Sequence, residues 1–135
     1  MSSVKEPSPQ NPRHLRIAYI SFFVVQSLDC FLFITLHPQL FKDQSVLSDP
    51  TQFFIRANAI TLFPFILLVF SLRGHHVSSS IGRRVVIAFT LFHALGLFLL
   101  FWARIHGSWH LDPFWAAVGC HTAWFASGAA ALMGY

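Results

Sequence analysis

The sequence predicts an all-α protein, a bundle of four transmembrane helices. Hydrophobic residues make up 55 % of the chain and charged residues only 10 %, whereas soluble domains carry about 25 % charged residues. The apolar residues are also gathered in blocks of roughly 20 residues, the length at which a helix crosses about 30 Å of hydrocarbon. Because the alternating pattern of transmembrane strands is missing, we expect helices as the spanning elements. The four blocks are 17–36, 53–72, 85–103 and 113–133.

Polar and proline-rich sequence flanks the first block. We expect residues 1–14 to form a disordered tail and residues 15–135 to form the four-helix transmembrane domain. His37-Pro38 predicts the end of the first helix, because the residue before proline disfavours the helical region. The connection that follows is long enough to hold a short interfacial helix over 40–47.

Short polar segments separate the other three blocks. Asp49-Pro50 is a helix start signal before the second block, and Gly74 is a normal residue to end that helix. The polar and basic segment 74–84 and the short segment 104–112 bound the third block. We therefore expect four antiparallel helices whose connections are too short to form a further domain.

Lys and Arg residues are distributed unevenly between the two ends of the predicted bundle. The tail and the loop between the second and third blocks carry six of them, which are Lys5, Arg13, Arg16, Arg73, Arg83 and Arg84. The opposite end carries three, which are Lys42, Arg56 and Arg104. The positive-inside rule then places both termini in the cytosol, and we expect the chain in the endoplasmic reticulum membrane. Because the basic residues flank membrane spans, the net charge of +4 does not indicate a nucleic-acid partner.

Polar side chains within the apolar blocks gather in the half of the membrane nearer the lumen. Asp29 and His121 lie about 11 and 12 Å inside the lumenal boundary, and His93 lies about 16 Å inside it. A charged group at the bilayer centre costs at least about 2.5–3.5 kcal/mol, so we expect these groups to face one internal pocket that opens toward the lumen. Its predicted polar members are Gln26, Asp29, Arg56, Asn58, His93 and His121, and its predicted aromatic walls are Phe22, Phe33, Phe89 and Trp124.

Two interpretations of these polar residues stay open. Side chains such as Gln26 and Asn58 can simply hold membrane helices together, and an Asp29–Arg56 ion pair would lock the first helix to the second. The histidines suit lipid poorly and can exchange protons near neutral pH, which favours a functional role. Gly96 lies one turn from His93 and leaves room beside its imidazole.

Acid–base chemistry on a hydrophobic small molecule is the function that this pattern favours. A carboxylate placed in a low-dielectric site beside a cation is common where catalysis takes place. The sequence shows no nucleotide-binding loop, Ser-His-Asp set or nucleophilic cysteine motif, so we predict an isomerisation or cyclisation that uses no cofactor and no metal. The candidate catalytic residues are Asp29, His93 and His121, and the candidate substrate-binding residues are Gln26, Arg56, Asn58 and Trp124.

Other functions remain as alternatives. The chain could be a non-catalytic lipid-binding or accessory membrane subunit. His93 and His121 lie on sequential antiparallel helices, as in bis-histidine haem ligation, although no C-x-x-C-H motif or carboxylate cluster accompanies them. The fourth block is rich in Gly and Ala and could pack within one chain or against a second copy in a homo-oligomer.

The span 15–134 resembles the small four-helix integral membrane proteins of uncharacterised or DoxX-like type. The most similar segment is FFIRANAITLFPFILLVFSLRG, in which Phe54, Arg56 and Ala57 form an F-x-R-A start to the second helix. Fungal members of this kind often belong to secondary-metabolite clusters, where small membrane proteins act as cyclases, isomerases or oxygenases. The resemblance therefore implies a biosynthetic membrane enzyme, and it assigns no catalytic residue.

Overall fold

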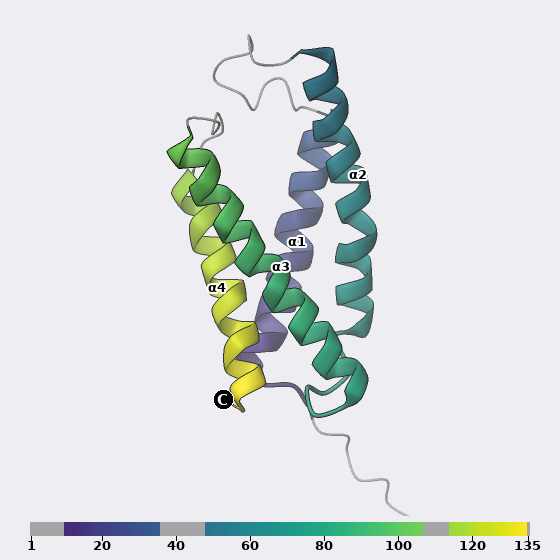
Figure 1. Cartoon of the computed structure of the whole chain (residues 1–135). Coiled ribbons are helices and arrows are strands. Elements are labelled where there is room, and N and C mark those ends of the chain that lie inside the picture. Colours follow the sequence, from purple (N-terminus) through teal and green to yellow (C-terminus); the bar gives the residue numbers. More distant parts are fainter. Residues whose placement is uncertain (1–9, 36–47, 107–113, 135) are drawn as a thin grey trace, which may run out of the picture.

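A computed structural model describes residues 10–35, 48–106 and 114–134. These residues form four α-helices and no strand: α1 (Arg13–Thr35), α2 (Asp49–Leu72), α3 (Ser80–Ile105) and α4 (Phe114–Met133). The helices run alternately up and down the bundle in chain order (Figure 1). The all-α fold class predicted from the sequence is confirmed. The interfacial helix predicted over 40–47 lies outside the described residues, as does the end of the first helix at His37.

Three of the helices, α1, α2 and α3, are long and apolar enough to cross a membrane. They make the chain a membrane protein. α4 has 20 residues, which span about 30 Å, but small and polar residues such as His121 lower its hydropathy. α3 and α4 form the most extensive helix pair, followed by α1 and α2. The polar residues of α4 can therefore be covered by α3 rather than by lipid.

Serine side chains fix the starts of α2 and α3, and only the start of α3 differs from the predicted one. α2 begins at Asp49 as expected, because the hydroxyl of Ser48 accepts the N–H of Thr51 at 3.4 Å. α3 begins at Ser80 rather than at 85, because the hydroxyl of Ser79 accepts the N–H of Gly82 at 3.0 Å. A serine immediately before a helix satisfies a backbone donor that the first turn leaves without a partner.

Asn11 joins the segment before α1 to the turn between α2 and α3. Its amide nitrogen donates to the carbonyl oxygens of Arg73 and His75 at 3.0 and 2.8 Å. Its side-chain oxygen accepts the N–H of Val77 at 2.8 Å. Asn11 is buried and α1 begins at Arg13, both within the segment 1–14 for which the sequence predicts a disordered tail. Residues 1–9 of that segment lie outside the described residues.

The aromatic ring of Phe22 lies at the centre of the core. It is fully buried and meets rings from the three other helices edge to face. Centroid distances of 5.1–6.1 Å separate it from Phe65, Phe89, Phe92, His93 and Trp124. Edge-to-face pairs of this kind contribute about 0.5–1.5 kcal/mol beyond the area that they bury. One side chain of α1 therefore contacts each of the three other helices.

The packing is uneven along the bundle. The fully buried residues Leu15, Tyr19 and Val86 lie in the half that contains the α2–α3 turn. Toward the opposite end the α1–α2 and α3–α4 pairs move apart (Figure 1), and α2 makes little contact with α3. Large apolar side chains such as Phe53 and Ile105 are exposed there, as suits helices that face lipid.

The first prediction concerns Gly82, which lies under the α2–α3 turn. A methyl group at this position would overlap the carbonyl oxygen of His76 and lie 2.8 Å from that of His75. We expect Gly82→Ala to lower the free energy of unfolding by about 1–3 kcal/mol, since backbone atoms must shift to make room. Thermal unfolding in detergent micelles, followed by circular dichroism, measures this change.

Gly119→Ala is the matched control, because Gly119 is also helical and has open space where a methyl group would lie. Its helix should become more stable by about 0.5–1 kcal/mol. Equal melting temperatures for the two variants would contradict the proposed close contact.

Candidate functional site

The structure brings His93 of α3 and His121 of α4 into direct contact. Their Nδ1 atoms lie 3.2 Å apart, a hydrogen-bonding distance at which one ring donates to the other. His93 is fully buried. A methyl group at Gly96 would lie 2.5 Å from the Nδ1 of His121, so the glycine allows the two rings to meet. The space that the sequence predicted beside the His93 imidazole is thus occupied by His121.

Aromatic side chains surround the histidine pair. The ring of His93 lies 4.5–5.1 Å from those of Phe22, Phe89, Phe92 and Trp124. The indole N–H of Trp124 donates to the hydroxyl of Ser21 at 2.9 Å, which holds the indole against α1. Three of the four predicted aromatic walls therefore lie around His93. The fourth, Phe33, is partly buried elsewhere against the core.

One nitrogen of the pair has no partner. Among the described residues, none forms a hydrogen bond with the buried Nε2 of His93. Leaving a buried polar atom without a partner costs about 1–3 kcal/mol. If His93 donates to His121, its Nε2 carries a free lone pair; if it accepts, Nε2 carries a buried N–H. In either tautomer this atom can bind one further polar group.

The histidine pair lies near the middle of the bundle. Because α3 begins at Ser80 and ends at Ile105, His93 lies near the middle of that helix. Ser21, in the first half of α1, lies beside the same site through its bond to Trp124. The start of α3 at Ser80 is marked in the sequence by its capping serine, Ser79.

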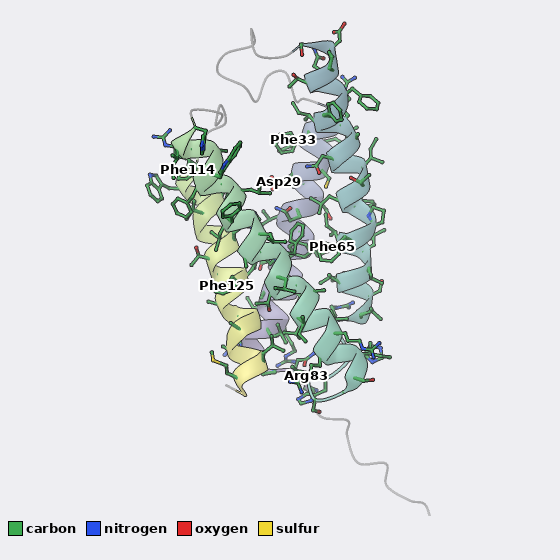
Figure 2. All side chains as sticks on the ribbon, in the orientation of Figure 1. Asp29, Phe33, Phe65, Arg83, Phe114 and Phe125 are labelled. Atoms are coloured by element: carbon green, nitrogen blue, oxygen red, sulfur yellow. The ribbon has the colours of Figure 1, made fainter. Side chains whose placement is uncertain are left out.

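Gln26 and Asp29 form a second polar pair on α1. The amide nitrogen of Gln26 donates to the Asp29 carboxylate at 3.0 Å, as their spacing on one helix face predicted. Gln26 is buried and Asp29 is half-buried. In Figure 2, Asp29 lies farther from Arg83 and the α2–α3 turn than Phe65 does. Among the described residues, no hydrogen bond connects this pair to either histidine.

The prediction that Arg56 and Asn58 face the same interior pocket is wrong. Both side chains are exposed. The inward face of α2 contains the buried residues Ala59, Ile66 and Val69, and helical geometry leaves Arg56 and Asn58 beside this face rather than on it. The structure also shows no salt bridge between Asp29 and Arg56, although both are described. The six predicted polar residues thus separate into the histidine pair, the α1 pair and two exposed residues of α2.

Haem does not fit between the two histidines. A metal held in line by two imidazoles at about 2 Å each would place the ligating nitrogens about 4 Å apart. The Nδ1 atoms are closer than this and bonded to each other, and Phe22 and Trp124 pack against His93. Within the described part of the chain, no group of three or more His, Cys, Asp or Glu side chains could hold a metal ion. Cys30 and Cys120 are both free thiols.

The fold and the site together define a class: a helical membrane protein with a buried histidine pair inside aromatic walls. Protein-family models, curated proteins and solved structures give no match to this chain. The functional argument therefore depends on the geometry of the site itself.

The second prediction is a thermodynamic coupling between the two histidines. His121→Leu leaves both nitrogens of His93 without a partner, so we expect a cost of about 1–3 kcal/mol in the free energy of unfolding. Replacing both histidines by leucine should cost less than the two single changes added together, with a coupling of about 0.5–3 kcal/mol. Unfolding of the four proteins of this cycle in mixed micelles measures the coupling, and additive effects would contradict the hydrogen bond.

Proposed function

We propose that this protein is a small integral membrane enzyme that catalyses a cofactor-free isomerisation or cyclisation of a hydrophobic small molecule. The observation that supports this best is the unpartnered Nε2 of His93, a fully buried nitrogen in an aromatic environment. Native structures usually avoid such an atom, because apolar neighbours cannot replace the hydrogen bond that it would make to water. A polar or acidic hydrogen of a bound substrate would give it a partner.

The hydrogen bond to His121 suits His93 for proton transfer. When the Nε2 of His93 takes a proton from the substrate, its Nδ1 proton can move to the Nδ1 of His121, 3.2 Å away. The positive charge is then shared by two rings rather than held on one buried imidazole. Returning the proton to a different substrate atom completes an isomerisation or a cyclisation with no net gain or loss of protons.

The surroundings of the pair favour an apolar substrate. Phe22, Phe89, Phe92 and Trp124 offer ring edges and faces around His93. Such walls exclude water, and they can stabilise the positive charge that develops on the imidazole rings by a cation–π interaction. A substrate of this kind would enter from the bilayer, and because His93 is fully buried, the surrounding rings would have to move to admit it.

Asp29 and Gln26 serve in this proposal as a second contact point. Phe22, Gln26 and Asp29 share one face of α1, so the carboxylate lies about 10 Å along the helix from the ring that touches His93. An elongated substrate could place a hydroxyl or amine at Asp29 while its reacting carbon lies near the histidines. In this proposal Asp29 binds the substrate or acts as a second acid, whereas the sequence favoured a direct catalytic role for it.

An accessory membrane subunit is the second candidate function. The observation that favours it is the exposed small-residue face of α4, which includes Ala116, Gly119 and Ala123. Small side chains allow a helix of another chain to approach closely.

We further propose an endoplasmic reticulum location with both termini in the cytosol. Asn11 places the segment before α1 at the same end of the bundle as the α2–α3 turn. Arg83 and Arg84 follow that turn, and Arg13 and Arg16 lie in the first turns of α1. This concentration of arginine supports a cytosolic position for this end.

The third prediction tests the orientation with single cysteines in a chain whose Cys30 and Cys120 are replaced by alanine. A membrane-impermeant maleimide added to the cytosolic side of microsomes should label both Ser3→Cys and Ser78→Cys. Ser108→Cys should react only after the membrane is permeabilised. Labelling of residues 3 and 78 from opposite sides would contradict the proposed topology.

The fourth prediction concerns activity. Cells that express the chain should contain a lipid-soluble product with the mass of its precursor but a different retention time, because isomerisation and cyclisation conserve mass. His93→Gln should lower its formation by about 10²–10⁴-fold, the usual contribution of general acid–base catalysis. Chromatography with mass spectrometry of matched extracts measures the product.

Asp29→Asn is the comparison variant, since it keeps the shape and the hydrogen bond to Gln26 but removes the proton chemistry. We expect a smaller loss for it than for His93→Gln. Identical extracts from wild type and His93→Gln, at equal membrane levels of protein, would contradict the enzyme and favour the accessory subunit.

A further inference from the structure

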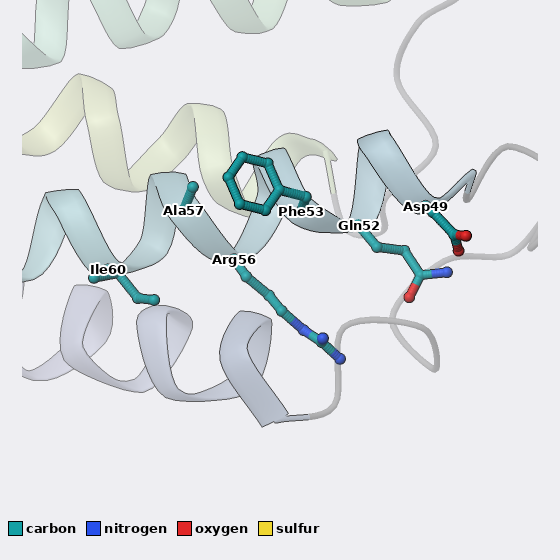
Figure 3. A pocket seen from close by; sticks show the side chains of 6 residues that line it. All are labelled: Asp49, Gln52, Phe53, Arg56, Ala57 and Ile60. Atoms are coloured by element: carbon teal, nitrogen blue, oxygen red, sulfur yellow. The ribbon is translucent and has the colours of Figure 1, made fainter.

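A surface cavity on α2 lies apart from the histidine pair. Its volume is about 400 Å³, and its described lining comes from the first three turns of the helix (Figure 3). The lining combines charged, amide and apolar side chains: Asp49, Gln52, Phe53, Arg56, Ala57 and Ile60. Neither the core nor the proposed chemistry uses this cavity.

The lining residues follow a fixed chemical order along the helix. Asp49 lies in the first turn and is exposed. Arg56 follows two turns later, and Ile60 one turn after that. In Figure 3 the Arg56 side chain leaves α2 obliquely and slants toward the N-terminal end of the helix, the direction in which helical side chains lean. Along the helix the charged side chains come first, Asp49 and then Arg56 with Gln52 and Phe53 between them, and the apolar Ala57 and Ile60 lie deepest.

The depth of Arg56 matches the boundary between headgroups and hydrocarbon. A helix of 24 residues is about 36 Å long, so an upright α2 extends about 3 Å beyond each side of a hydrocarbon core of about 30 Å. The Cα of Arg56 lies about 10 Å from that of Asp49 and thus about 7 Å below the boundary. Its side chain can snorkel back toward the surface, which brings the guanidinium to the hydrocarbon boundary, directly below the layer of lipid phosphates.

We propose that this cavity binds a zwitterionic phospholipid. The guanidinium of Arg56 pairs with the phosphate, and the carboxylate of Asp49 faces the ammonium group of choline or ethanolamine. Phe53 lies beside the headgroup, and Ile60 contacts the upper acyl chain. Phospholipids in a bilayer present the same order: amine outermost, phosphate next, acyl chain innermost. Arginine suits phosphate because its planar fork donates two parallel hydrogen bonds.

The charges of the cavity select among related ligands. The carboxylate of Asp49 gains an ion pair only from a headgroup that carries an ammonium group. Phosphatidylglycerol, whose glycerol headgroup is neutral beyond its phosphate, should therefore bind more weakly than phosphatidylcholine. Free phosphate would leave Phe53, which is 67 % exposed, and Ile60 without a contact. Ser48 rather than Asp49 supplies the N-cap of α2, so the carboxylate can be changed without removing the cap.

Native mass spectrometry of the full chain in detergent, titrated with phosphatidylcholine or phosphatidylglycerol, tests the proposal. Wild type should bind phosphatidylcholine more tightly. Arg56→Gln should weaken phosphatidylcholine binding about tenfold or more, as expected for the loss of a charge-assisted pair. Asp49→Asn should remove the preference between the two lipids while phosphate recognition remains.

Arg104→Gln is the matched control, because this exposed arginine of α3 is close to the same end of the bundle but lies outside the cavity. It should leave phosphatidylcholine binding unchanged. An equal loss in Arg104→Gln would show non-specific attraction and overturn the site. A wild-type preference for phosphatidylglycerol, or full competition by millimolar inorganic phosphate, would also overturn it.

Discussion

The contact on which the rest of this structure depends is the insertion of Phe22 between the helices. Its ring meets side chains of α2, α3 and α4, and the same ring forms one wall of the histidine site. Lipid tails are as apolar as core side chains, so membrane helices associate through close packing and hydrogen bonds rather than through exclusion of water. A single well-packed aromatic group can therefore set the position of the core and the site together.

Close approach of α3 and α4 is the second requirement of the site. Two glycines make it possible: Gly96 lies against the ring of His121, and a methyl group at Gly128 would overlap the hydroxyl of Thr90. Thr90 in turn donates to the carbonyl oxygen of Val86 at 2.7 Å, which satisfies its hydroxyl within α3. Gly96 of α3 thus allows the two histidines to meet, and Gly128 of α4 allows its helix to approach Thr90 closely.

The polar side chains within the apolar helices are accommodated in different ways. His93 and His121 bond to each other in the interior, and Gln26 bonds to Asp29 along one helix. Arg56 instead slants toward the N-terminal end of α2 from an exposed position. Interior pairs gain strength from their low-dielectric surroundings, whereas an arginine at the boundary remains available to lipid. The proposed chemistry therefore lies at the histidine pair in the core, and the proposed lipid site lies on the exposed surface of α2.

The sequence by itself determined the four helices, including the start of α2 at Asp49 and its end at Leu72, because hydropathy and capping act within one segment. It also indicated the histidines, the room beside Gly96 and the Gln26–Asp29 pair, which follow from composition and helical spacing. Only the tertiary structure decided that Arg56 and Asn58 face outward and that the two histidines bond to each other. Rotation of a helix about its axis and its vertical offset from its neighbours depend on side chains from several helices packing at once. No pattern within a single segment contains that information.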